Sequence, residues 1–332
     1  MKILVDCFGG DNCPQEAVKG AVLALNEKSD LFVGLVGQKD KIEEVLNTLS
    51  YDKSRLEIIE ANDVITNDDN PIMAIRRKKD SSMVVSLNTL HEKDYQGLVS
   101  SGNTGALLTG ATLIVRLIKG VSRAMLAPIV PTIYKDKYTI VCDAGANVDC
   151  KASMLKEFAI MGDIYVKKAF NVENPKIGLL NNGAEEEKGN ALTKEAYQIL
   201  KESKLNFVGN VEATDTVSGV VDVLVTDGFA GNVAIKATEG MAKNFLKLVK
   251  DGVKNGGLKA KIGALLLKDT LRGVKSKMSV DEVGGATLLG IQKVIVKAHG
   301  SSTAVPFKAA ILQASKMVEG DVCGLIEKGM NE

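Results

Sequence analysis

The stretch GLVSSGNTGALLTGATLIVRLI, residues 97–118, contains the unit from which the fold is built. An apolar run at 97–99, followed by Ser100, predicts a buried strand at 97–100, because a strand covered on both faces needs no polar alternation. Glycine, serine and asparagine follow in a short loop, and apolar residues then recur at helical spacing up to 118. The stretch predicts a strand, a glycine-rich turn and a helix in direct succession.

The same succession recurs along the 332-residue chain. Alternation of strands and helices is typical of an α/β protein with a doubly wound, mostly parallel sheet. Besides 97–100, strands are predicted at 2–5, 31–36, 56–60, 139–142, 176–180, 207–211, 221–225 and 293–297, and helices at 14–27, 39–49, 103–118, 190–201 and 232–249.

Composition excludes several classes of protein. The net charge is +1, aromatic residues are 4 % and tryptophan is absent, so no nucleic-acid partner is expected. Five cysteines without a CxxC pair indicate reduced thiols rather than a disulfide framework or a zinc site, and no metal is expected. The apolar runs are too short for a signal peptide or a membrane span, which predicts a cytoplasmic protein.

One segment differs from the rest of the chain in charge. Residues 250–279 contain eight lysines and arginines but only two aspartates. Within this segment Leu258, Ile262, Leu265 and Leu266 recur at helical spacing. We therefore expect a basic, amphipathic helical insertion at 241–279, and a single α/β catalytic domain formed by 1–240 and 280–332.

Glycine and small polar residues cluster directly after the predicted strands. Ligands of open parallel sheets bind beyond the carboxyl ends of the strands, and glycine lets backbone N–H groups approach an anion. Such turns are also needed simply to build the fold, but they do not require so many aspartates and asparagines. The candidate phosphate- or acyl-binding residues are Asp6, Gly9, Gly10, Asp11, Gly102, Asn103, Thr104, Gly105, Asp143, Asn147, Asn181, Gly183, Glu186, Gly189, Asn190, Asp227, Gly228, Gly231, Gly300 and Ser301.

Two side chains in these loops could carry chemistry. Lys188 lies beside Gly189 and Asn190, where a cation would complete a phosphate site, although most lysines are simply solvated. His299 follows a strand and precedes GlySerSer; a lone histidine can equally be structural. No GxSxG, Walker A or GxGxxG motif is present, so a serine nucleophile, ATP and NAD lack their usual signatures.

Taken in order, the loops resemble the acyl-acyl carrier protein:phosphate acyltransferase family, PlsX, of bacterial phospholipid synthesis. The matching stretches run from residue 5 to residue 302. They are VDCFGGDNCP, SSGNTGALL, DAGANVDCK, FAIMGDIY, NPKIGLLNNGAEEEKGN, NFVGNVEATD, DGFAGNVAIK, GGATLLG and AHGSS. The chain departs from the family pattern at Cys7, Phe8 and Asn182.

The resemblance implies a Rossmann-like α/β/α sandwich related to isocitrate and isopropylmalate dehydrogenases, with protruding helices and a homodimer. It implies transfer of a long-chain acyl group from acyl carrier protein to inorganic phosphate, without a cofactor. The acyl phosphate would feed a membrane acyltransferase acting on glycerol 3-phosphate. At matching positions Lys188 and Asn232 are the catalytic candidates, and His299 is a candidate proton donor to the departing thiolate.

The sequence also predicts a membrane-contact surface and leaves two alternative functions open. Leu258, Ile262, Leu265, Leu266 and Leu267 are expected to contact the inner face of an anionic membrane without spanning it, so that the protein is peripheral. An oxidoreductase on the same fold would need a nicotinamide pocket and usually a set of metal-binding aspartates. An acyl-binding protein without activity would need an apolar cleft but neither Lys188 nor the six polar loops.

Overall fold

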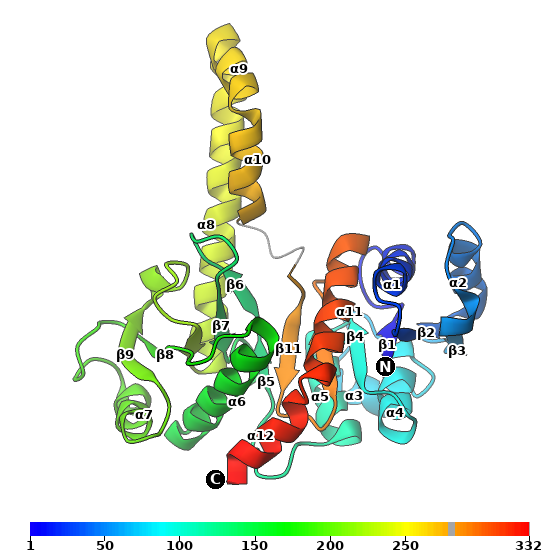
Figure 1. Cartoon of the computed structure of the whole chain (residues 1–332), viewed down its shortest axis with the longest axis horizontal. Coiled ribbons are helices and arrows are strands. Elements are labelled where there is room, and N and C mark those ends of the chain that lie inside the picture. The colour runs from blue at the N-terminus through cyan, green and yellow to red at the C-terminus, as the bar shows by residue number, and fades with distance from the viewer. Residues whose placement is uncertain (278–282, 332) are drawn as a thin grey trace.

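The computed structural model describes residues 1–277 and 283–331 and shows an α/β fold with two mostly parallel sheets (Figure 1). The first sheet has the order β3-β2-β1-β4-β12-β11-β5, in which β11 runs antiparallel to both neighbours. Its strands are β1 (Lys2–Asp6), β2 (Phe32–Gly37), β3 (Leu56–Glu60), β4 (Gly97–Ser100), β5 (Met125–Ala127), β11 (Ala286–Leu289) and β12 (Val294–Lys297).

The second sheet has the order β6-β7-β10-β8-β9, with only β6 antiparallel. Its strands are β6 (Ile129–Pro131), β7 (Tyr138–Cys142), β8 (Ile177–Asn181), β9 (Phe207–Glu212) and β10 (Val223–Val225). The chain passes from the first sheet to the second at β5 and β6, which only Pro128 separates. The single sheet expected from the sequence is thus divided in two, because the short strands at this junction carry no periodicity that could reveal them.

Helices cover both faces of the first sheet. The helices before the arm are α1 (Gln15–Glu27), α2 (Lys39–Leu46), α3 (Pro71–Arg77), α4 (Ser82–Glu92), α5 (Thr104–Gly110), α6 (Ala152–Phe170) and α7 (Ala191–Lys201); the last two of the chain are α11 (Ala304–Glu319) and α12 (Val322–Asn331). On one face Ile3 and Val5 share a core with residues of α1 and α11, while on the other Leu4 shares one with residues of α4 and α5. Alternate residues of β1 are therefore buried on opposite faces, as its unbroken apolar run predicts.

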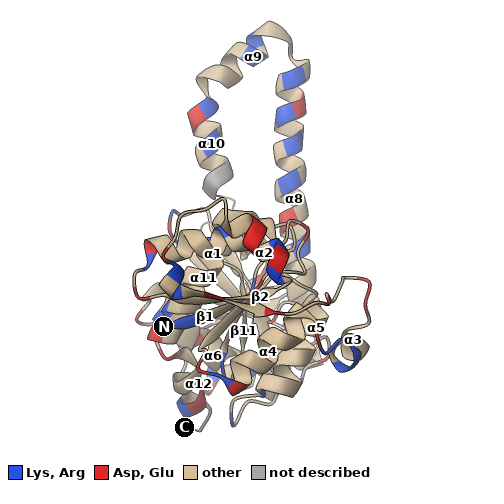
Figure 2. Ribbon diagram, turned by 90° about the vertical axis from the view of Figure 1, so that its right-hand side faces the viewer, with Lys and Arg blue, Asp and Glu red and all other residues tan. Residues whose placement is uncertain are grey.

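A helical arm projects from this body (Figures 1 and 2). It consists of the outer part of α8 (Gly228–Asn255), then α9 (Gly257–Leu266) and α10 (Lys268–Lys277). The helical character expected for 241–279 is present up to 277, whereas 278 and 279 lie outside the described residues. The arm does not begin at 241 as a separate element, because α8 is continuous from a loop at the end of β10.

Candidate functional site

Three neighbouring strands of the first sheet end in one cluster of polar residues. We call residues 6–13, 100–105 and 297–302 the first cluster. Asp6, Ser100 and Lys297 stand opposite one another in the registers of β1, β4 and β12. The Ser100 hydroxyl donates to the buried Asp6 carboxylate at 2.7 Å. The strand pairing therefore sets the geometry of this cluster.

Close backbone contacts join the loops of the first cluster. The Asp11 N–H donates to the Gly300 carbonyl at 2.8 Å, and the Asn12 amide donates to the Ser301 carbonyl at 3.0 Å. Gly9 has φ +145°, and a Cβ there would lie 2.8 Å from the Gly102 Cα. Glycine is needed at this position both for its conformation and for the close approach of the two loops.

Lys297 is the cation of the first cluster, and sequence reasoning missed it. Its ammonium donates to the carbonyl oxygens of Ser101 at 3.1 Å and Ala298 at 2.6 Å. Burial lowers the pKa of Lys297 to about 8, although the charges of Asp6, Cys13 and Asp11 oppose this shift. The signal available in the sequence was a lone lysine at the end of an otherwise apolar strand.

His299 lies at the exposed edge of the first cluster. Its Nδ1 is 2.9 Å from the Ser301 hydroxyl and accepts from the Ser301 N–H at 3.3 Å. These contacts engage one ring nitrogen and leave Nε2 facing no described partner. The histidine is therefore held in orientation and could transfer a proton through Nε2.

A second cluster lies at the ends of β7 and β10 and comprises residues 143–147 and 227–232. Asp143 is buried, and its carboxylate accepts from the backbone N–H groups of Leu126 at 2.8 Å and Asn147 at 2.7 Å. Burial raises the pKa of Asp143, while these hydrogen bonds act in the opposite direction. A Cβ at Gly231 would lie 2.0 Å from the Asp143 carbonyl oxygen, so glycine lets α8 begin against this loop.

Asn232 has a different role from the residue that caps α8. The cap is Asp227, whose carboxylate accepts from the N–H groups of Phe229 at 3.0 Å and Ala230 at 2.8 Å. Asn232 lies in the second turn, is exposed, and has its side chain beside Gly145. Its amide makes no hydrogen bond with any described residue, so it is available to donate to a ligand.

The third cluster is the loop 181–190 between β8 and α7. Amides hold its backbone: Asn181 donates to the Lys188 carbonyl at 3.2 Å, and Asn210 of β9 donates to the Glu185 carbonyl at 2.7 Å. The Lys188 side chain is exposed. Asn210 was not among the predicted residues; its Oδ1 is buried without a hydrogen-bond partner among the described atoms.

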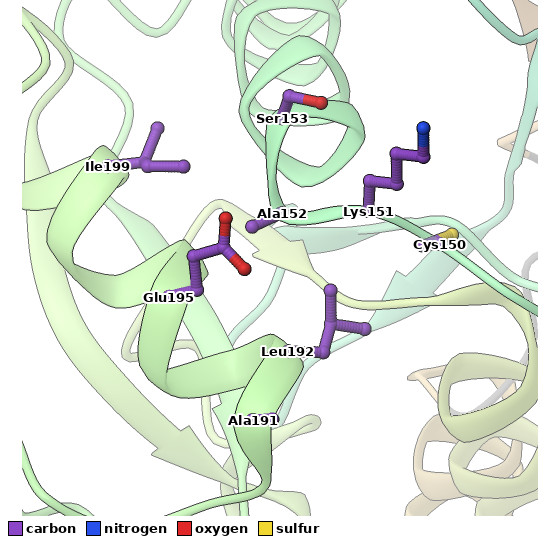
Figure 3. A pocket seen from close by; sticks show the side chains of 8 residues that line it. All are labelled: Cys150, Lys151, Ala152, Ser153, Ala191, Leu192, Glu195 and Ile199. Atoms are coloured by element: carbon purple, nitrogen blue, oxygen red, sulfur yellow. The ribbon is translucent and has the colours of Figure 1, made fainter.

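A hollow of about 420 Å³ separates the starts of α6 and α7 (Figure 3). It adjoins the second cluster through Cys150, whose thiol donates to the Asn147 carbonyl at 3.5 Å, and the third through Ala191, which follows Asn190. None of its lining residues was predicted from the sequence. They are Cys150, Lys151, Ala152, Ser153, Ala191, Leu192, Glu195 and Ile199.

Several residues predicted to bind a ligand instead cap a helix or form an ion pair within the protein. Asn103 caps α5, accepting from Ala106 N–H at 2.9 Å, and Asn190 caps α7 in the same way through Thr193. Glu186 points to α7, where it pairs with Lys201 at 2.9 Å. No hydrogen bond between described residues joins the first cluster to the second or the third, or the second cluster to the third. In residues 1–277 and 283–331, no group of three or more histidine, cysteine, aspartate or glutamate side chains is placed to hold a metal ion.

The sequence of the chain was compared with family models and with known proteins. A family model described as fatty acid synthesis protein matches residues 1–325. A protein of Clostridium acetobutylicum named phosphate acyltransferase is 46 % identical over 332 residues, covering 100 % of this chain and 99 % of that protein. The chain belongs to this phosphate acyltransferase family. A phosphate acyltransferase of Acetivibrio thermocellus is 48 % identical, covering 96 % of this chain and 93 % of the relative.

Solved structures show the same fold at much lower identity. A phosphotransacetylase from Streptococcus pyogenes superimposes with a TM-score of 0.61 at 19 % identity, covering 96 % of this chain and 94 % of that one. EutD phosphotransacetylase from Staphylococcus aureus gives 0.58 at 17 % identity, covering 95 % and 94 %. The resemblance drawn from the loops is confirmed, and so is the class of enzyme, an acyltransferase of fatty acid and phospholipid synthesis.

Proposed function

We propose that the chain transfers a long-chain acyl group from the thioester of acyl carrier protein to inorganic phosphate. The observation that carries this function is the full-length match to phosphate acyltransferases, combined with an unpaired amide at Asn232 and an exposed cation at Lys188. The loops that bear these residues follow β10 and β8, which are paired neighbours. Both side chains therefore belong to one edge of the second sheet, where ligands of parallel sheets bind.

The reaction requires little covalent chemistry from the protein. A phosphate oxygen attacks the thioester carbonyl carbon, an oxyanion forms, and the C–S bond breaks as the acyl phosphate is released. Lys188 neutralises the incoming phosphate, and the Asn232 amide donates to phosphate or to the oxyanion. Preorganised donors of this kind contribute about 3 kcal/mol each to the stability of a transition state.

The departing thiolate needs a proton, and His299 is the proposed donor through Nε2. His299 belongs to the first cluster, whereas Asn232 and Lys188 belong to the second sheet. This assignment therefore requires a bound substrate that reaches from one sheet to the other. The remaining predicted glycines and aspartates of the three clusters would shape the loops around that substrate.

The proposal is tested by following palmitoyl-carrier protein with and without phosphate. Wild-type protein should release free carrier only when phosphate is present, and Lys188→Ala should abolish that release while keeping its melting temperature. Lys204→Ala, which changes another exposed lysine, is the matched control. Binding of palmitoyl-carrier without phosphate-dependent release would instead support an acyl-binding protein, and Lys188→Ala activity within threefold of wild type would reject Lys188 as the central cation.

The arm supports the proposed homodimer. On α8 the exposed apolar side chains Met241, Phe245 and Leu248 lie along one face, and Met241 is 72 % exposed. Exposed apolar stripes at helical spacing are normally covered by another helix. We propose that a second copy of the chain covers this face with its own arm.

The end of the arm supports the proposed contact with a membrane surface. Leu258, Leu265 and Leu266 are 76 %, 70 % and 80 % exposed, and Ile262 and Leu267 also face solvent. In the described residues no helix is long and apolar enough to cross a bilayer. Exposed leucines among lysines suit insertion into the interface of an anionic membrane, with the charges remaining at the headgroups.

A further inference from the structure

Five lysines recur along a single face of α8. They are Lys236, Lys243, Lys247, Lys250 and Lys254. At 100° per residue their side chains fall within about 60° of arc, and they extend over about 27 Å of the helix. Figure 2 shows basic residues repeated along this helix from the body to the outer end of the arm. We call these five residues the lysine face.

The lysine face continues directly into the candidate site. Asn232 and Phe229 fall within the same arc of about 60° when the helical rotation is followed back to the start of α8. Both residues are exposed, and Phe229 is 64 % exposed. Because α8 is one continuous helix from Gly228 to Asn255, a rigid element connects the amide of the site to the row of positive charges.

The charges on this face are largely uncompensated. Lys236 pairs with Glu239 at 2.8 Å. The other four lysines are exposed and have no ion-pair partner among residues 1–277 and 283–331. The apolar side chains Met241, Phe245 and Leu248 lie on roughly the opposite side of the helix. A second copy that covers the apolar face would therefore leave the lysine face open.

We propose that the lysine face of α8 is the docking surface for the acidic protein that carries the acyl thioester, and that docking there directs the thioester to Asn232. The inference rests on the proposed function, since it names how the donor of that reaction is recognised. Positive charge along one surface attracts an acidic partner and sets its orientation. Phe229 supplies an apolar contact at the end of the face that is nearest to the chemistry.

A lipid surface fits the lysine face less well than a protein does. The row begins at Lys236, four residues from Asn232, and runs along the side of the arm. The exposed leucines lie beyond its outer end, in α9 and just after it. A bilayer that receives those leucines would be near Lys254 but distant from Lys236. Only a partner lying along the helix can contact the whole lysine face and reach Asn232.

The test compares a large and a small acyl donor. The variant Lys243→Glu, Lys247→Glu, Lys250→Glu should raise KM for palmitoyl-carrier protein about tenfold or more, with kcat nearly unchanged, because it opposes docking and leaves the reacting groups in place. With S-palmitoyl-pantetheine, which has no protein surface, the variant and the wild type should have equal kcat/KM. Activity with this small donor also shows that the variant is folded.

A matched control distinguishes an effect of the lysine face from an effect of the protein's net charge. The variant Lys53→Glu, Lys204→Glu, Lys328→Glu makes the same change in charge at exposed lysines elsewhere, and it should leave both donors unaffected. An unchanged KM for palmitoyl-carrier in the lysine-face variant would overturn the inference. The inference would also be overturned if that variant lost binding to anionic vesicles and kept its KM for the carrier. A wild-type protein that uses neither donor would instead contradict the proposed function itself.

Discussion

At the scale of single residues, the first turns of α8 contain one capping side chain, Asp227, and one unpaired amide, Asn232. Asp227 accepts two backbone N–H groups and caps the helix, whereas Asn232 lies in the next turn with a free amide. Asn232→Ala should therefore lower kcat by about 100-fold or more, as loss of an oxyanion donor does, with little change in stability. Asp227→Ala is the counterpart, and should lower the free energy of unfolding by about 1 kcal/mol.

Both quantities can be measured on the same preparations by steady-state kinetics and urea unfolding. The assignment of Asn232 fails if Asn232→Ala loses stability as Asp227→Ala does while retaining its kcat. In that case the amide would be part of the packing against Gly145 rather than part of the chemistry.

Lys297 makes the stability of the protein depend on pH. Its pKa is about 8 in the folded protein, below the ordinary value of 10.5, because burial disfavours the charged form. Between these two values the unfolded chain binds a proton that the folded protein has lost, so this residue makes stability rise with pH. Below pH 8 both states carry the charge, and the cost of burying it is present in full.

The corresponding experiment compares wild type with Lys297→Met by urea unfolding at about pH 7 and about pH 9.5. The wild type should gain stability relative to the variant at the higher pH. Parallel pH dependence of the two proteins would show that Lys297 titrates as a solvated lysine. Asp6, Asp11 and Cys13 are the charged or titratable groups around it, and they are the same in both proteins.

At the scale of elements, strands with an uninterrupted apolar run were predictable, and three short strands without one were not. The nine predicted strands are present, and most of them contain a run of valine, isoleucine or leucine, as buried strands do. The strands β5, β6 and β11 were missed, since prolines at 128 and 131 interrupt the first two and β11 begins with the weakly apolar pair Ala286 and Thr287. Because β5 and β6 link the two sheets, this omission also concealed the division of the sheet.

The loops of the candidate site were predictable from the sequence, but the roles of single residues in them were not. Its loops follow strands, and the glycines and asparagines in them mark turns whether or not they bind a ligand. Sequence alone could not show that Asn103 and Asn190 cap helices, or that Glu186 turns to Lys201. Nor could it reveal Lys297 and Asn210, because a single polar residue in a strand carries no pattern.

The arm has two exposed apolar regions, one on α8 and one at its outer end. Leu266→Glu, at its outer end, should abolish flotation with anionic vesicles and leave the protein dimeric, because it places a charge where lipid contact is proposed. Phe245→Glu, on the inner apolar face, should instead produce monomers. Flotation at low and high salt and light scattering measure the two properties separately.

Different results would overturn the two proposals for the arm. Monomers from Leu266→Glu would assign the outer leucines to the dimer. Failure of the wild type to float at low salt would remove the membrane contact altogether, without affecting the proposed reaction.

At the scale of the whole molecule, two sheets, three loop clusters and a rigid arm have to act on one substrate. The helix α8 joins the second cluster to the arm, since it begins in that cluster and forms one side of the arm. Positioning of the thioester and recognition of the carrier would then follow one another along α8, and attachment to a membrane would lie beyond its outer end, in α9. The chemical step is the point at which all of these contributions meet.

That step is measured most directly by trapping its product. Palmitoyl-carrier protein and phosphate are incubated with wild type, Lys188→Ala or Asn232→Ala, and hydroxylamine converts any acyl phosphate to a hydroxamate that is quantified by mass spectrometry. We expect phosphate-dependent palmitoyl hydroxamate from the wild type, at levels about 100-fold above those from either variant. Absence of hydroxamate from the wild type, or equal amounts from all three proteins, would contradict the proposed mechanism.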